Sequence, residues 1–114
     1  MPHPIPETWR SAVRKTLKRG DVRQIALTRR AWHEWQAQFP KFNFDYELFD
    51  VLANALDDPA LAGNQVTGMK DPRTTYEFIF QHENQPVYAK INLFPDNTVV
   101  IVYSAHRPTK GDTL

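Results

Sequence analysis

The sequence contains no cysteine, so it excludes disulfide bonds, thiol catalysis and cysteine-based zinc sites. Its four glycines build neither a phosphate-binding loop nor a dinucleotide-binding pattern, and no Gly-x-Ser-x-Gly nucleophile elbow is present. The four histidines do not fall at metal-ligand spacings. We therefore expect no metal and no cofactor, which leaves side-chain acid–base chemistry or a non-catalytic role.

Long apolar runs are also missing. No stretch is apolar enough to span a membrane, and the first residues lack the apolar core of a signal peptide. The formal net charge is only +1, so attraction to an acidic partner must come from locally clustered cations. These features predict a cytoplasmic protein without a membrane partner.

A chain of 114 residues is long enough for one hydrophobic core, so we expect a single domain over 1–114. Prolines at alternate positions predict an extended lead-in over 1–6. The segment 108–114 has no apolar residue before its last position and is expected to be a frayed tail.

Apolar spacing in the first half predicts three helices. Trp9, Val13 and Leu17 recur every four residues, and Gly20 follows as a helix-ending residue. Thr28 can cap a second helix over Arg29–Gln38, and Asp45 can cap a third, strongly apolar helix that continues to Leu56. Asp21–Leu27 remains ambiguous between a short strand and the start of the second helix.

Alternating apolar residues in the second half predict three strands, over Thr74–Gln81, Val87–Leu93 and Thr98–Ser104, and a weaker fourth over Gln65–Lys70. The predicted fold class is therefore α+β, with N-terminal helices packed on a C-terminal antiparallel sheet of three to four strands.

The same alternation sorts each strand into two faces. The predicted core faces are Tyr76, Phe78 and Phe80, then Val87, Ala89, Ile91 and Leu93, then Val99, Ile101 and Tyr103. The opposite faces carry polar residues, among them Glu77, Gln81, Tyr88, Lys90, Asn92, Ser104 and His106. If Phe94 pairs with Thr98, Tyr88 lies opposite Ser104, and Lys90 lies near Ser104 and His106.

Such a polar face suits RNA cleavage without a metal. That reaction needs groups that remove the 2′-OH proton and protonate the leaving oxygen, and cations that stabilise the charged phosphorus intermediate. The candidate catalytic residues are Lys90, His106, Tyr88 and Gln81, and the candidate substrate-binding residues are Lys70, Arg73, Ser104 and Arg107.

Two cations of the first helix, Arg14 and Lys18, could add phosphate contacts. An ordinary solvated helix face explains them equally well. Polar residues are likewise common on the wet side of any antiparallel sheet.

The order of these features resembles that of MqsR-type toxins, mRNA interferases of the RelE-like ribonuclease group. The resemblance runs from about Ser11 to Arg107. It rests on Gly20-Asp21-Val22-Arg23, Met69-Lys70 with Thr74-Thr75-Tyr76, Phe80-Gln81, Val87-Tyr88-Ala89-Lys90-Ile91 and the final strand Val100–Ser104. It implies an α+β fold, metal-independent cleavage of mRNA and neutralisation by a cognate antitoxin protein.

Gln81 and Tyr88 fall on the family's sheet-face Gln and Tyr, and Lys70 approximates a family Lys. The family's closing Ser-Phe-Lys is Ser104-Ala105-His106 here, so a His replaces a Lys. Histidine is a competent acid–base group near neutral pH.

Two other functions stay open from the sequence. One is a non-catalytic RNA- or protein-binding module that uses the basic helix and the sheet face. The other is an immunity or accessory protein of a mobile element, with which the near-neutral net charge is compatible.

Overall fold

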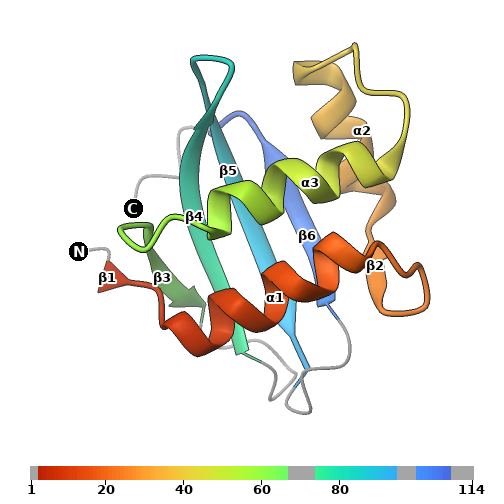
Figure 1. Cartoon of the computed structure of the whole chain (residues 1–114). Helices are drawn as coiled ribbons and strands as arrows, with labels where there is room; N and C mark the ends of the chain where they lie inside the picture. Colours follow the sequence, from red (N-terminus) through yellow and green to blue (C-terminus); the bar gives the residue numbers. More distant parts are fainter. Residues whose placement is uncertain (1–2, 67–73, 95–99, 109–114) are drawn as a thin grey trace.

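The computed structural model describes residues 3–66, 74–94 and 100–108 (Figure 1). The elements are β1 (His3–Pro4), α1 (Glu7–Arg19), β2 (Ile25–Leu27), α2 (Arg29–Gln38), α3 (Asp45–Leu56), β3 (Ala62–Val66), β4 (Thr74–His82), β5 (Gln85–Leu93) and β6 (Val100–His106). The predicted α+β class is confirmed. Lys70, Arg73 and most of the predicted tail lie outside the described residues.

The sheet is larger than predicted. Its six strands run in the order β1-β3-β4-β5-β6-β2, and β2 lies parallel to β6 while the other pairs are antiparallel. The expectation of three to four antiparallel strands behind a block of helices was therefore wrong. β1 and β2 are only two and three residues long, too short to show a periodic pattern, and they flank α1 in the chain.

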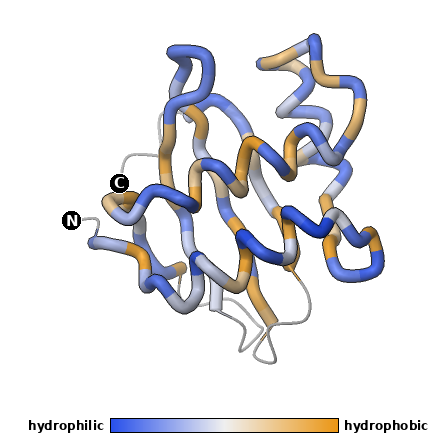
Figure 2. The backbone as a smooth tube through the Cα atoms, in the orientation of Figure 1, coloured by the Kyte–Doolittle hydropathy of each residue, from blue (hydrophilic) through white to orange (hydrophobic). Residues whose placement is uncertain are grey.

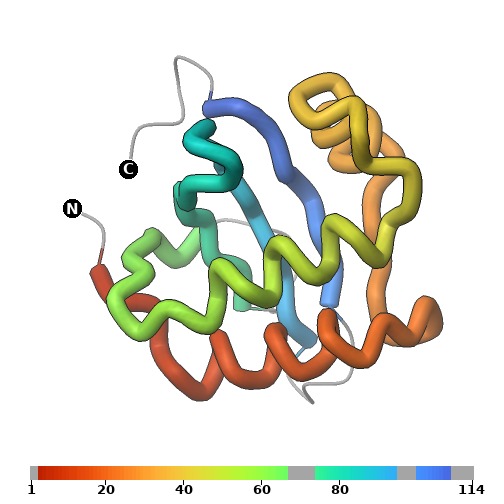
Figure 3. Tube along the Cα trace, turned by 45° about the horizontal axis from the view of Figure 1, so that its top comes forward, coloured from red at the N-terminus to blue at the C-terminus, as the bar shows by residue number. Residues whose placement is uncertain are grey.

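Two helices cover one face of the sheet. α1 and α3 run side by side across it, and α2 lies beside β6 (Figures 1 and 3). Hydropathy alternates along both covering helices, as amphipathic elements require (Figure 2). Their buried side chains include Val13, Leu17, Leu48, Leu52 and Leu56, which join Phe78, Ile91 and Val102 of the sheet in one core. No helix of the described segments is long and apolar enough to cross a membrane.

A tight hairpin joins the two longest strands. His82 pairs with Gln85, so only Glu83 and Asn84 form the loop, and both have positive φ, at 52° and 62°. This geometry matches the right-handed twist of the flanking strands, and it sets the register of the whole β4–β5 ladder.

β6 contains an irregularity that the sequence did not predict. Lys90 pairs with Ser104 but Ile91 pairs with Val102, so Tyr103 has no partner in the β5–β6 ladder. Such a bulge shifts the alternation of side chains by one position.

The bulge changes which residues of the last strand face the core. Val100 and Val102 are fully buried, in place of the predicted Ile101 and Tyr103, and Val99 lies outside the described residues. Past the bulge, Ala105 is fully buried, and the alternation therefore puts Ser104 and His106 on the predicted outer face.

Arg10 links α1 to the end of α3. Its side chain is 7% exposed, and its guanidinium donates to the carbonyls of Ile5 at 3.2 Å, Leu56 at 3.0 Å and Asp58 at 3.3 Å. The last carbonyls of a helix have no intrahelical partner, so this buried cation satisfies the end of α3 and fixes the lead-in before α1.

We expect Arg10→Met to lower the free energy of unfolding by about 3 kcal/mol, because the buried carbonyls of Ile5 and Leu56 and the partly buried carbonyl of Asp58 lose a charged donor. Urea denaturation measures the change. Arg14→Met is the matched control, since Arg14 forms a partly exposed ion pair with Asp57 on the same two elements, and its loss should cost less than about 1 kcal/mol. Equal losses in the two variants would contradict the role given to Arg10.

Candidate functional site

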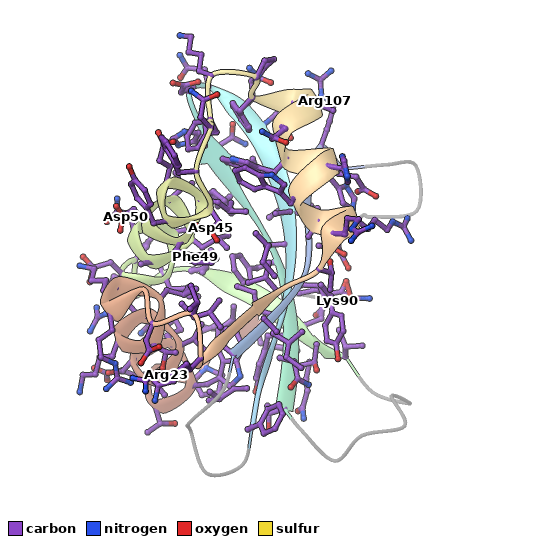
Figure 4. The ribbon with its side chains drawn as sticks, turned by 90° about the vertical axis from the view of Figure 1, so that its right-hand side faces the viewer. Arg23, Asp45, Phe49, Asp50, Lys90 and Arg107 are labelled. Atoms are coloured by element: carbon purple, nitrogen blue, oxygen red, sulfur yellow. The ribbon has the colours of Figure 1, made fainter. Side chains whose placement is uncertain are left out.

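Four polar side chains gather on the face of the sheet that α1 and α3 leave uncovered. Tyr88 lies directly opposite His106, and Lys90 lies opposite Ser104. We call these four residues the sheet-face cluster. The ring centroids of Tyr88 and His106 are 5.3 Å apart. Figure 4 shows Lys90 on the side of the sheet away from α3.

The predicted register was wrong by one residue from Leu93 to Ile91, and by two residues at Lys90 and at Tyr88, which was expected opposite Ser104. A shift by two keeps every side chain on its face, whereas a shift by one would move all of them to the other face. The structure therefore brings Tyr88, Lys90, Ser104 and His106 together as the sequence suggested, with different pairs across the ladder.

A carboxylate of the neighbouring strand completes one side of the cluster. The Tyr88 hydroxyl donates to Glu77 Oε2 at 3.2 Å, and Glu77 lies opposite Lys90 in the β4–β5 ladder. Lys90 Nζ is 5.8 Å from the ring centroid of Tyr103, within range of a cation–π interaction. The alternation along the strand predicted that Glu77 lies on this face, but Glu77 was not among the predicted site residues. Its position opposite Lys90 could have identified it.

His106 is held from both sides of its ring. Nδ1 is 2.7 Å from the carbonyl oxygen of Arg107, which can only accept, so Nδ1 carries the proton in this contact. Nε2 is 3.4 Å from Glu34 Oε2, and the His106 side chain is only 15% exposed.

Glu34 belongs to α2 and also accepts from Arg30 Nε at 2.6 Å. Sequence reasoning missed Glu34. Its approach to His106 depends on the way α2 packs beside β6, and no local pattern encodes that contact.

The remaining predicted residues fall in three places. Gln81 is exposed on β4 and lies opposite Pro86, close to the hairpin. Arg107 is exposed just after β6, and its guanidinium donates to Gln85 Oε1 at 3.2 Å. Arg14 and Lys18 lie on α1, on the covered side of the sheet, so they do not join the sheet-face cluster.

The cluster combines acid–base and cationic groups. A phenol, an ammonium, a hydroxyl and an imidazole come from two residue pairs that are neighbours on this face, with the carboxylate of Glu77 on one side and that of Glu34 on the other. Groups of this kind can bind an anion and move a proton. Among residues 3–66, 74–94 and 100–108, no three His, Asp or Glu side chains come together as metal ligands.

Comparison of the chain with protein-family models, with curated proteins and with solved structures found no match. The resemblance to MqsR-type toxins therefore remains a prediction from the sequence. Function is therefore inferred from the geometry of the sheet-face cluster.

We expect Glu34→Gln to change the environment of His106 without unfolding the protein, because Glu34 is partly exposed and contributes little to the core. Two-dimensional aromatic NMR should show the His106 ring signals moving toward those of an unstructured histidine. The signals of His3 and His82 should stay in place, since within the described segments neither residue forms a hydrogen bond or ion pair with Glu34. An unmoved His106 signal would mean that Glu34 does not hold the ring.

Proposed function

We propose that this protein is a metal-independent endoribonuclease that cleaves mRNA, and that it acts as the toxin of a toxin–antitoxin pair. One observation supports the enzymatic part: Tyr88, Lys90, Ser104 and His106 lie together on the face of the sheet opposite α1 and α3. The toxin role and the cognate antitoxin are suggested by the resemblance to MqsR-type proteins alone.

The proposed reaction is an internal transfer at phosphorus. The 2′-oxygen loses its proton and attacks the adjacent phosphate, the bond to the 5′-oxygen breaks, and that oxygen takes up a proton. The products are a 2′,3′-cyclic phosphate and a 5′-hydroxyl end. No external oxidant, reductant or group donor is needed.

Each residue of the face has a role in this reaction. His106 transfers the proton through Nε2, which leaves Glu34 to take the proton from the 2′-OH and then gives it to the 5′-oxygen, while the Arg107 carbonyl holds Nδ1–H. Lys90 stabilises the negative charge that grows on the phosphate oxygens, and the Ser104 hydroxyl donates a hydrogen bond to them. Directly opposed residues of an antiparallel ladder lie about 5 Å apart, a spacing that one phosphate group can bridge.

Further residues bind the RNA around the reacting phosphate. Tyr88 and Gln81 orient the nucleotide, and Arg107 contacts a neighbouring phosphate. Lys70 and Arg73 keep the substrate-binding role suggested by the sequence.

Base stacking on this face is not the mode of binding that we propose. Tyr88 is 8% exposed, so little of its ring is available to a base. Domains that bind single-stranded RNA on a sheet present exposed aromatic rings for stacking. The low exposure of Tyr88 therefore argues against binding by base stacking.

The test is induced expression in a bacterial host, with new RNA ends mapped in total mRNA. We expect growth arrest and site-specific cuts with 5′-hydroxyl ends for the wild type, and cleavage reduced about 100-fold or more in Lys90→Ala and in His106→Ala. Cleavage of a purified transcript should persist in the presence of a chelator.

Lys18→Ala is the matched control, because it removes an exposed cation from the opposite side of the molecule. It should leave cleavage within about two-fold of the wild type, since the cluster is intact. Healthy growth and intact mRNA with the wild type would refute the proposal. So would full activity in both alanine variants of the face.

A further inference from the structure

β2 leaves one edge of the sheet open to solvent, since no described strand pairs with its outer side. The N–H of Val100 donates to the carbonyl of Gln24 at 2.8 Å, and the N–H of Thr28 donates to the carbonyl of Val102 in β6 at 3.2 Å. Backbone groups alternate in direction along a strand, so the N–H and C=O groups of Ile25 and Leu27 point to the open side. An added extended segment could bond to both residues.

A hollow of about 790 Å³ lies directly beside this edge. Its lining residues are Val22, Ile25, Leu27, Arg29, Trp32, Asn43, Phe44, Asp45 and Phe49. Figure 4 looks toward this side of the molecule, with Asp45 and Phe49 of α3 and Arg23 of the loop before β2 labelled around it. The volume is in the range of sites that bind small ligands or the side chains of a partner.

Exposed apolar side chains are concentrated here. The large apolar residues exposed in the described segments are Val22, Phe44 and Tyr46, at 72%, 56% and 55%. Val22 and Phe44 line the hollow, and Tyr46 stacks on Phe44 with ring centroids 5.4 Å apart. A patch of this kind next to an open strand edge is typical of a protein-binding surface.

The charges of the lining indicate which class of partner fits. Arg29 and Asp45 are its charged residues, and neither forms an ion pair within the described part of the chain. One cation and one anion give no net attraction for RNA, whose binding requires an excess of cations. Nearby Arg23 is already occupied, since its guanidinium donates to Asp21 and lowers the pKa of that carboxyl.

We propose that this edge and hollow form a docking site for an extended segment of a partner protein, which adds to the sheet beside β2. Its apolar side chains enter the hollow against Phe44 and Phe49, and one of its carboxylates pairs with Arg29. Main-chain bonds to Ile25 and Leu27 give the segment its direction, and the hollow gives it specificity. This site is separate from the sheet-face cluster and does not depend on the proposed ribonuclease activity.

Two substitutions can weaken the site without weakening the fold. Phe44 immediately precedes α3, a position that favours serine, and its N–H already donates to Glu47 Oε1 at 3.0 Å. Phe44→Ser therefore removes lining surface and keeps the helix start. Arg29 is the first residue of α2, where an acidic residue is favourable, so Arg29→Glu reverses the charge without cost to the helix. Lys15→Glu is the matched control for the charge reversal, because Lys15 is an exposed cation of α1 that does not line the hollow.

The experiment selects random dodecapeptides displayed on phage against the folded full chain. We expect recovered peptides to share alternating apolar residues and an Asp or Glu. Synthetic copies should bind the wild type, and Phe44→Ser and Arg29→Glu should each weaken binding by about ten-fold or more. Lys15→Glu should change it by less than about two-fold. Amide exchange should slow at Ile25 and Leu27 when peptide is added, since their N–H groups gain acceptors.

Several results would overturn the proposal. They are failure to recover any binding peptide, binding that ignores both substitutions, or unchanged exchange at Ile25 and Leu27. Slower exchange caused by a single-stranded RNA oligonucleotide would assign the surface to nucleic acid instead. A mass that doubles with concentration in sedimentation, and that Phe44→Ser returns to the monomer, would assign it to a second copy of this chain.

Discussion

The extra residue at Tyr103 decides which side chains of β6 face the core and which face solvent. Before it, Val100 and Val102 are fully buried, and after it, Ser104 and His106 lie on the uncovered face. A regular strand through the same residues would put the valines and His106 on one side. The bulge thus allows one strand to supply the core at its start and the reactive face at its end.

Longer amphipathic elements could be predicted from the sequence, because many residues repeat the same signal. The second helix was predicted over Arg29–Gln38 and is found there, with the Thr28 hydroxyl accepting from Ala31 N–H at 3.1 Å as the expected cap. The third helix is also found, over Asp45–Leu56, but Asp45 is its first residue and Phe44 holds the cap position expected for Asp45. Its apolar stripe was therefore the reliable signal, whereas in the second helix the cap and the stripe agree.

The shortest strands and the alternation within β6 could not be predicted. β1 and β2 contain too few residues for a pattern, and they are stabilised by pairing with β3 and β6, far away in the chain. In β6, every residue from Val99 to Tyr103 is β-branched or aromatic, so neither alternation stands out. Packing into the common core with the helices selects Val100 and Val102 as the buried residues.

In the candidate site too, local patterns predicted some features, whereas others depend on tertiary contacts. Residues that face outward from adjacent strands could be grouped from alternation alone, and a register error of two residues left the group intact. Glu34 could not be found in this way, because it reaches His106 from a helix. Local sequence therefore determines which residues share this face, whereas the contact of Glu34 with His106 depends on tertiary packing.

The position of β6 inside the sheet has a consequence for folding kinetics. β6 is the last described strand in the chain, yet it lies between β5 and β2 and carries the contacts of α2. Pairing of Ile25 with Val100 closes a loop that includes most of the protein, and such non-local contacts slow folding. During synthesis, β2 has no strand to pair with, and Glu34 has no His106 to contact, until β6 is made. The sheet-face cluster is thus completed only in the final stage of folding.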